Sequence, residues 1–197
     1  PGDFDLDEVA RVPLFWTSGT ALSQEPSRSS TLEALAARRG GITVHDLDFR
    51  PMFWPSRDEA GRLGREALRQ ATVAVGNLEE VSVVVGDLEP DEAAEALLAL
   101  GPDLAIVKLG PKGVLARSAT EHCVVPPVEI EVVNGLGAGD AFGGALCHGL
   151  LSEWDLERTI RFANAAGALV AGRLGCADDM PTAEEIEELL AGQPTSG

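Results

Sequence analysis

The sequence has few basic residues, few cysteines and no long apolar run. Its 197 residues contain 15 Lys and Arg against 32 Asp and Glu, for a formal net charge of -17. Such a charge repels nucleic acid and anionic membrane surfaces, so the composition argues against both as partners. It also opposes a bound nucleotide, whose phosphates would need local positive features such as helix N-termini, Lys108 or Lys112.

The three cysteines, Cys123, Cys147 and Cys176, are odd in number and contain no C-x-x-C pair. Their spacing indicates neither a disulfide framework nor a zinc knuckle, and it favours the cytoplasm. No apolar run reaches the roughly eighteen residues that a membrane-spanning helix needs. Residues 1–5 contain no basic stretch followed by an apolar one, so we expect no targeting signal.

Apolar runs of strand length alternate with amphipathic helical stretches along the chain. We expect strands at 14–18, 42–46, 72–75, 104–109, 113–117, 122–125 and 129–133, with the pair at 113–125 forming a hairpin. We expect helices at 29–39, 57–70, 91–100, 139–151, 156–172 and 183–190. This alternation predicts an α/β fold with a mainly parallel sheet and crossover helices.

The boundaries of the chain lead to three further expectations. No repeat, low-complexity segment or linker interrupts the pattern, so one domain over 1–191 is the simplest organisation. The last helix is introduced by the capping box Thr182-x-x-Glu185, and 192–197 should form a disordered tail. The chain begins without Met directly ahead of an expected strand, so we expect an upstream portion to be missing.

The sharpest motif is N-G-L-G-A-G-D-A-F at 134–142, a run of small residues between an expected strand and a helix. Such a loop directs several backbone N–H groups, reinforced by the helix dipole, at one anionic group. Asp140 would lie in the first turn of the helix. There it could accept a proton from a hydroxyl while the loop amides hold the transferring phosphoryl group.

Two common nucleotide-binding loops do not fit this motif. A dinucleotide fingerprint needs a glycine where Asp140 stands, and Asp155 and Glu157 open a helix instead of ending a strand. A Walker loop needs G-K-[ST], which follows none of these glycines. A glycine-rich turn in which Asp140 merely favours the helix dipole stays open as an alternative.

The segment G-A-G-D-A-F at 137–142 resembles the C-terminal signature of the PfkB carbohydrate kinases. The resemblance implies a ribokinase-like three-layer α/β sandwich, of which this chain lacks the N-terminal part and the lid. It also implies that Asp140 is the catalytic base. The amides of Gly137, Ala138 and Gly139 would form the anion hole.

Two further segments resemble nucleotide-binding elements of this family. The stretch V-K-L-G-P-K-G-V at 107–114 is similar to the strand-turn-strand beside the nucleotide, although L-G-P-K-G also makes an ordinary turn. The stretch F-A-N-A-A-G-A at 162–168 suits close helix packing, and the resemblance places it beside the adenine. Together the two segments imply nucleotide contacts from Lys108, Gly110, Lys112, Gly113, Asn164 and Ala168.

Asn77-Leu78-Glu79-Glu80 follows an expected strand and resembles the N-x-x-E motif that organises Mg²⁺ and phosphates in this family. An amide and a carboxylate three residues apart share a helix face and suit water-mediated Mg²⁺ binding. The same pair also makes a helix N-cap, and both interpretations stay open. Asn134 stands where many members carry an Asp of a monovalent-cation site completed by 173–179, so dependence on such a cation stays open too.

The acceptor site is predicted at 45–50, H-D-L-D-F-R. Period-two alternation puts Asp46, Asp48 and Arg50 on one face at a strand's C-terminal end, where open α/β sheets bind ligands; a solvated strand end is the alternative. The stretches R-P-M-F-W at 50–54 and S-G-T-A-L-S-Q-E-P-S-R at 18–28 resemble the 5-dehydro-2-deoxygluconokinases of inositol catabolism. Arg50 could then pair bidentately with a substrate carboxylate.

These features together predict an ATP- and Mg²⁺-dependent kinase. Its expected acceptor is the primary hydroxyl of a sugar acid, 5-dehydro-2-deoxy-D-gluconate. The alternatives are another PfkB sugar kinase, acting on 2-keto-3-deoxygluconate or a similar sugar, and an inactive nucleotide-binding fragment. The expected partners are therefore small molecules, and the sequence leaves a homo-oligomer open.

Overall fold

The structure, a computed structural model, describes residues 5–192, and in this range the chain divides into two compact units. The first unit holds the described residues up to Leu109 together with Leu115–His122, and the second holds Gly110–Val114 and the residues from Cys123 onward. Of the expected tail, Gly192 ends the last helix, and 193–197 lie outside the described residues. No helix among the described residues is both long and apolar enough to cross a bilayer.

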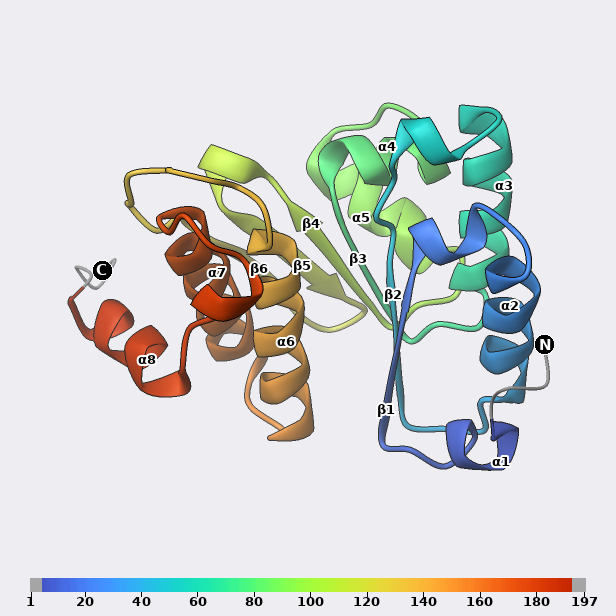
Figure 1. The fold of residues 1–197 in the computed structure, drawn as a ribbon, viewed down its shortest axis with the longest axis horizontal. Coiled ribbons are helices and arrows are strands. Elements are labelled where there is room, and N and C mark those ends of the chain that lie inside the picture. Colours follow the sequence, from blue (N-terminus) through green and yellow to red (C-terminus); the bar gives the residue numbers. More distant parts are fainter. Residues whose placement is uncertain (1–4, 193–197) are drawn as a thin grey trace. The chain divides into compact units, whose positions relative to one another are not determined.

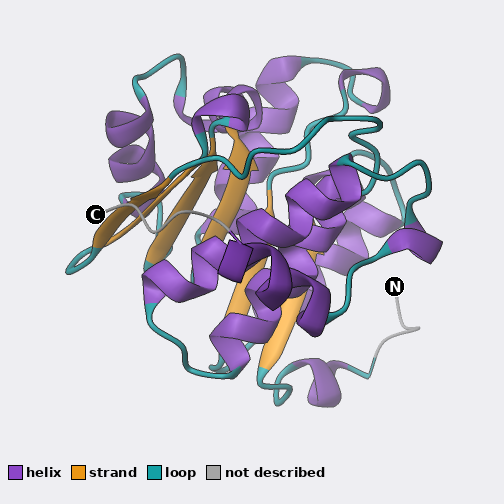
Figure 2. Cartoon of the chain, turned by 90° about the vertical axis from the view of Figure 1, so that its left-hand side faces the viewer, coloured by secondary structure: helices purple, strands orange, loops and turns teal. Residues whose placement is uncertain are grey.

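A parallel sheet forms the centre of the first unit. Its strands are β1 (Leu14–Ser18), β2 (Ile42–Asp46), β3 (Val73–Asn77) and β4 (Leu104–Lys108), which run in the same direction side by side (Figure 2, strands in orange). The strand order continues with β5 (Val114–Ser118) and β6 (His122–Val125), neighbours in sequence and in the sheet, as the predicted hairpin requires. The register pairs Ser18 with Asp46 and Asn77 with Lys108, so polar side chains gather at the carboxyl ends of the strands.

Helices connect the parallel strands of this unit because each crossover must return the chain to the same end of the sheet. These helices are α2 (Ser27–Ala37), α3 (Arg57–Leu68), α4 (Leu78–Val85) and α5 (Pro90–Leu98), with 3-10 turns η1 (Gly19–Leu22) and η2 (Pro51–Phe53). A short helix, α1 (Leu6–Val9), precedes β1. Figure 1 shows α2 and α3 together beside β1 and β2.

Two hydrophobic clusters hold these helices. Ala74, Ala105 and Val107, which point to one face of β3 and β4, pack with Val81 of α4 and Leu97 of α5. A second cluster joins η1, α2 and α3, and its members are Leu22, Leu35, Leu63 and Ala67. Each fully buried leucine contributes about 1.5–3 kcal/mol, so these clusters fix the positions of the strand ends.

The second unit contains α6 (Ala138–Leu151), α7 (Leu156–Ala171) and α8 (Ala183–Gly192), with 3-10 turns η3 (Gly110–Lys112) and η4 (Ala177–Asp179). Helices α6 and α7 lie side by side (Figure 1), and a Cβ at Gly167 would be 3.1 Å from the carbonyl oxygen of Ala138. The small residues of α7 therefore permit close packing, as predicted. The capping box is confirmed: Glu185 N–H donates to Thr182 Oγ1 at 3.3 Å, and Thr182 N–H donates to Glu185 Oε2 at 2.8 Å.

The strand expected at 129–133 does not form, and this prediction was wrong. The described chain has neither helix nor strand at 126–135. The N–H groups of Val133 and Asn134 both donate to the carbonyl oxygen of Ala171, at 2.8 and 3.0 Å. The end of α7 thus accepts the hydrogen bonds that a neighbouring strand would have taken, and the side chains of Val132 and Val133 stay exposed.

Candidate active site

The glycine-rich loop ends as a bare helix N-terminus in the second unit. Gly137 is the N-cap residue of the 14-residue α6 and has φ 85°, in the left-handed region that favours glycine. Ala141 N–H makes the first helical bond, to Gly137 O at 2.9 Å. The N–H groups of Gly139 and Asp140 precede it, in the first turn, where a helix has no carbonyl to offer. The loop therefore presents backbone donors at the positive end of the helix dipole.

Asp140 is exposed in this first turn. It borders a cavity of about 450 Å³ whose other lining residues come from α6, α7, α8 and the segment leading into α8. Apart from His148 these residues are apolar, among them Phe162 and Met180. The N-terminal position stabilises the negative charge of Asp140. An exposed carboxylate beside free amide donors can accept a proton while the amides hold an anion.

The predicted nucleotide-binding turn lies against α7 in the same unit. Gly113 has φ 90°, and a Cβ there would run into the carbonyl oxygen of Val125. The next residue, Pro126, accepts a hydrogen bond from Asn164 Nδ2 at 2.9 Å. Gly113 and Asn164 thus contact the same backbone segment, Val125–Pro126. Lys112 and Gly110 are exposed close to Gly113 in the chain. Ala168 follows Asn164 by one turn of α7. Asn164 uses its amide nitrogen to hold this segment, which leaves its carbonyl oxygen for a ligand.

The two segments expected to flank a monovalent cation are also adjacent. Asn134 Nδ2 donates to the carbonyl oxygen of Leu174 at 3.2 Å, and Asn134 Oδ1 accepts from Leu136 N–H at 3.1 Å. A Cβ at Gly137 would lie 2.5 Å from Cys176 Sγ. The 173–179 segment therefore packs directly on the glycine-rich loop.

A charged cluster lies at the carboxyl ends of the strands in the first unit. Burial raises the pKa of the Asp46 carboxyl to about 6; Lys108 opposes this shift, and the negative charges of Glu80 and Asp48 add to it. Asp46 ends β2 and Lys108 ends β4, so the parallel register brings together residues distant in sequence. The result is a carboxyl group that can hold or release a proton in the mildly acidic range.

The expected alternation through Arg50 was wrong, although the charges do gather. Strand β2 ends at Asp46, and Asp48 has φ 28°, so the chain leaves the sheet direction before Arg50. Asp48 N–H donates to Asp46 Oδ1 at 3.3 Å, and Arg50 Nε pairs with Asp48 Oδ1 at 2.9 Å. A turn, not strand periodicity, brings the three residues together.

Asn77 and Glu80 form the helix cap that their spacing permits. Glu80 N–H donates to Asn77 Oδ1 at 2.9 Å, and Asn77 N–H donates to Glu80 Oε2 at 2.7 Å. Glu80 is buried at the start of α4. In the described part of the chain, no three His, Cys, Asp or Glu side chains converge to hold a metal ion. Mg²⁺ held through water by the second Glu80 oxygen remains compatible with the cap.

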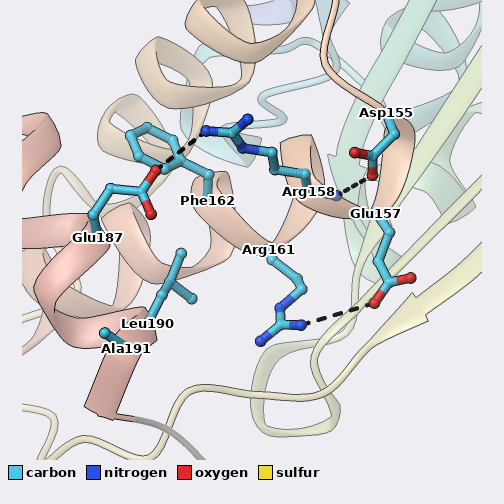
Figure 3. Close-up of a pocket in the computed structure, with 8 residues that line it drawn as sticks. All are labelled: Asp155, Glu157, Arg158, Arg161, Phe162, Glu187, Leu190 and Ala191. Atoms are coloured by element: carbon cyan, nitrogen blue, oxygen red, sulfur yellow. Dashed lines mark hydrogen bonds and ion pairs between the residues drawn. The ribbon is translucent and has the colours of Figure 1, made fainter. Parts of the chain in front are cut away.

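A second hollow of about 410 Å³ lies on α7 and α8, and Figure 3 shows its lining. Arg158 pairs with Glu187 at 3.6 Å, and Arg161 pairs with Glu157 at 3.9 Å. These charges satisfy one another at the surface. We therefore place the candidate site at the glycine-rich loop and not in this hollow.

Comparison with known proteins identifies the family of this chain. Residues 3–183 match the model of the pfkB family carbohydrate kinases. The chain belongs to this family. A ribokinase from Thermotoga maritima superposes with a TM-score of 0.78 at 26% identity over 96% of this chain, which confirms the predicted ribokinase-like α/β fold.

Relatives of this pfkB chain include proteins named 5-dehydro-2-deoxygluconokinase. The one from Geobacillus kaustophilus is 30% identical over 96% of this chain and 59% of its own length. The one from Clostridium perfringens is 29% identical over 95% of this chain and 58% of its own length. The chain thus spans about three fifths of the curated relatives it matches.

Two solved structures similar to this chain carry ligands. A fructokinase from Vibrio cholerae O395, bound to fructose, ADP and calcium, has a TM-score of 0.84 at 26% identity over 95% of this chain and 64% of its own. A putative ribokinase II from E. coli, in complex with ATP and Mg²⁺, has a TM-score of 0.83 at 25% identity over 96% of this chain and 62% of its own.

Sequence reasoning missed three polar residues near the charged cluster. Ser18 Oγ donates to Asp48 Oδ2 at 2.8 Å, and Thr20 Oγ1 donates to Asp48 O at 2.9 Å. His45 is fully buried with its Nδ1 2.9 Å from Thr17 Oγ1, and burial lowers the pKa of its imidazole to about 4. The resemblance of the S-G-T stretch was the one signal that could have pointed to Ser18 and Thr20.

Proposed function

We propose that this chain supplies the catalytic base and the nucleotide-binding elements of an ATP-dependent sugar-acid kinase. Its acceptor is the primary hydroxyl of 5-dehydro-2-deoxy-D-gluconate. The observation that carries the proposal is Asp140, exposed in the first turn of α6 beside the N–H group of Gly139 at the start of the helix. Family membership and the names of the relatives agree with it.

Each residue of the loop has a separate task in this proposal. Asp140 accepts the proton of the acceptor hydroxyl, as a positioned general base does. The amides of Gly137, Ala138 and Gly139 hold the anionic oxygens of the transferring group, and their helix dipole needs no reorganisation. Bound ATP with Mg²⁺ supplies the phosphoryl group and neutralises phosphate charge.

The remaining residues bind and orient the reactants. Gly110, Lys112, Gly113, Asn164 and Ala168 contact the nucleotide, and Lys108 contributes a positive charge from the end of β4. Asn77 and Glu80 hold Mg²⁺ through water, since the cap leaves one Glu80 oxygen unused. Arg50 binds the acceptor carboxylate, and Asp46 belongs to the same cluster through its hydrogen bond from Asp48 N–H.

Two alternatives keep parts of this proposal. Another sugar, such as 2-keto-3-deoxygluconate, would keep the chemistry and change the acceptor contacts. A nucleotide-binding fragment without activity is favoured by the chain's coverage of 59% of the Geobacillus kaustophilus relative. Kinase assays with a panel of acidic and neutral acceptors distinguish the first alternative from the proposal. An assay of ATP turnover distinguishes the second, because an inactive fragment would show none.

The test of the base is Asp140→Asn in the intact protein. The amide has the same shape and cannot take the proton, so phosphoryl transfer should fall by roughly 10²–10⁴-fold while nucleotide affinity changes little. Glu157→Gln is the matched control, because Glu157 also lies in the first turn of a helix, α7. Unchanged turnover in Asp140→Asn would remove Asp140 from the mechanism.

A further inference from the structure

The carboxylate of Asp48 is held from two sides. Its Oδ2 accepts the Ser18 hydroxyl at 2.8 Å, and its Oδ1 pairs with Arg50 Nε at 2.9 Å. The backbone of Asp48 is fixed as well, because its carbonyl oxygen accepts from Thr20 Oγ1 at 2.9 Å and its φ is 28°. The end of β1 and the start of η1 thus set the orientation of a residue that follows β2.

The two carboxylate oxygens of Asp48 have different partners, and this affects how Arg50 is bound. An aspartate with both oxygens free can bind a guanidinium bidentately, accepting two parallel N–H hydrogen bonds. Here one oxygen accepts the Ser18 hydroxyl, and the ion pair with Arg50 joins Nε to the other oxygen at 2.9 Å. Within residues 5–192, no other ion pair or hydrogen bond is formed by the Arg50 side chain, which is 59% exposed. The two terminal nitrogens of Arg50 therefore keep their donors for a ligand.

These terminal nitrogens match one class of ligand. Their two N–H groups form the planar fork that binds a carboxylate bidentately. They lie just beyond the carboxyl ends of β1 and β2, where open α/β sheets bind ligands. Each carboxylate oxygen of Asp48 already has one partner, Ser18 on Oδ2 and Arg50 on Oδ1.

We propose that Ser18 and Asp48 are positioning residues that keep the Arg50 fork open for the carboxylate of the acceptor. This inference rests on the proposed function. It adds that the preference for acidic acceptors depends on the contacts that link Ser18, Asp48 and Arg50. Asp48 thereby changes from a substrate ligand to a residue that acts through Arg50. Without the Ser18 hydroxyl, Asp48 is free to turn, to bind Arg50 through both oxygens and to compete with the acceptor.

The kinetic test compares three variants of the intact protein. Ser18→Ala should raise KM for an acidic acceptor roughly ten-fold, as for a lost hydrogen bond to a charged group, while kcat and the KM for a neutral sugar stay near wild type. Ser18→Thr keeps the hydroxyl and should restore the acid KM. Ser23→Ala is the control: it removes a hydroxyl from the same segment, where Ser23 N–H still holds Thr20 O at 3.1 Å.

A second readout follows the arginine directly. In nuclear magnetic resonance spectra, the terminal guanidinium N–H groups of Arg50, assigned with Arg50→Lys, should respond to D-gluconate in wild type and Ser18→Thr. In Ser18→Ala they should exchange more slowly without ligand and respond about ten-fold more weakly to D-gluconate.

The outcomes separate this inference from the kinase proposal. An unchanged acid preference in Ser18→Ala, or equal losses for acidic and neutral acceptors, would overturn the positioning role and leave the kinase intact. Absence of phosphoryl transfer to any acceptor by the wild-type protein would instead defeat the kinase proposal. In that case the D-gluconate titration still decides the inference: no response of Arg50 in the wild type overturns it.

Discussion

Among the candidate acceptor-site residues, Asp46 has a carboxyl pKa that its position in the fold raises. Burial at the end of β2 raises the pKa of its carboxyl from 3.8 to about 6, despite Lys108 nearby. The folded state therefore binds this proton more tightly than the unfolded chain. The stabilisation from the proton is complete below about pH 4 and is lost as the pH rises through 6.

This sign gives a prediction for Asp46→Asn. The amide stays neutral and can still accept from Asp48 N–H, so the variant should gain stability relative to wild type as the pH rises from 3.5 to 7.5. The gain in unfolding free energy should reach up to about 3 kcal/mol for a pKa moved from 3.8 to about 6. Urea unfolding at both pH values measures it. Asp87→Asn, at a carboxylate that is 97% exposed, is the control, and an equal difference at both pH values would contradict the prediction.

Arg50→Lys tests the carboxylate clamp by keeping the charge and removing the fork. A lysine cannot donate two parallel N–H groups, so a carboxylate-bearing acceptor should lose roughly ten-fold in kcat/KM while a neutral sugar loses little. Steady-state kinetics on a gluconate-type acid and its neutral counterpart measure the ratio. Equal losses for both acceptors would argue against Arg50 as the clamp.

At the residue scale the sequence located the charged positions but not their partners. Asp46 and Arg50 were predicted from strand alternation, which stops at Asp46 in the structure. The turn at Asp48 depends on hydrogen bonds from Ser18 and Thr20, about 30 residues away in the chain. A local pattern contains no information on such a contact.

At the element scale, the capping box of α4 links structure to the proposed Mg²⁺ role. Asn77→Ala should cost about 0.5–2 kcal/mol of unfolding free energy because it leaves Glu80 N–H without its acceptor. Asn77→Asp keeps an acceptor and serves as the matched control. A loss of the same size in Asn77→Asp would show that the cap is not the cause.

Glu80→Gln separates the cap from the metal. The amide oxygen can still accept from Asn77 N–H, so stability should stay within about 1 kcal/mol of wild type. The charge is lost, so Mg²⁺-dependent nucleotide binding should weaken while Mg²⁺-free binding does not. Calorimetry with and without Mg²⁺ checks this, and a variant that binds like wild type would remove Glu80 from the metal site.

Elements with one clear period were predictable, and those with mixed signals were not. The bounds predicted for β1, β2 and β6 agree with the structure, and each end of the predicted helices lies within two residues of the observed end. The start of α4 was anticipated from the Asn77–Glu80 cap, but its length was not, because its valine-rich sequence, L-E-E-V-S-V-V-V, lacks a clear helical period. The apolar residues at 129–133 suggested a strand, yet no neighbouring strand takes their hydrogen bonds.

At the scale of the whole molecule, the sequence predicted the family and the fold class but not the two units. Residues Gly110–Val114 belong to the second unit and Leu115–His122 to the first, so the division cuts through a single short strand. Nothing in composition or spacing marks that point. The predicted nucleotide contacts are divided accordingly, with Lys108 in the first unit and the other five in the second.

This division supports a prediction about binding and catalysis in the 197-residue chain. The glycine-rich loop, the Gly110–Gly113 turn and Asn164 all lie in the second unit, which packs through its own contacts. The chain covers 59% of the Geobacillus kaustophilus relative, and the resemblance places the substrate lid outside these residues. We therefore expect weak, Mg²⁺-assisted binding of ATP or ADP without sugar-acid phosphorylation, because a lid positions the acceptor and excludes water.

Two measurements on one mass-verified sample test both halves of this prediction. Calorimetry with ADP and Mg²⁺ should give a dissociation constant below the millimolar ligand concentration used, and Asp140→Asn should bind alike. A coupled kinase assay should show no acceptor phosphorylation. Robust phosphorylation by the chain would mean that acceptor positioning needs no lid. The geometry of the loop amides and of the Gly110–Gly113 turn is set within this chain by Gly137, Gly113 and Asn164. Undetectable binding at millimolar ADP would therefore mean that these elements alone do not bind a nucleotide.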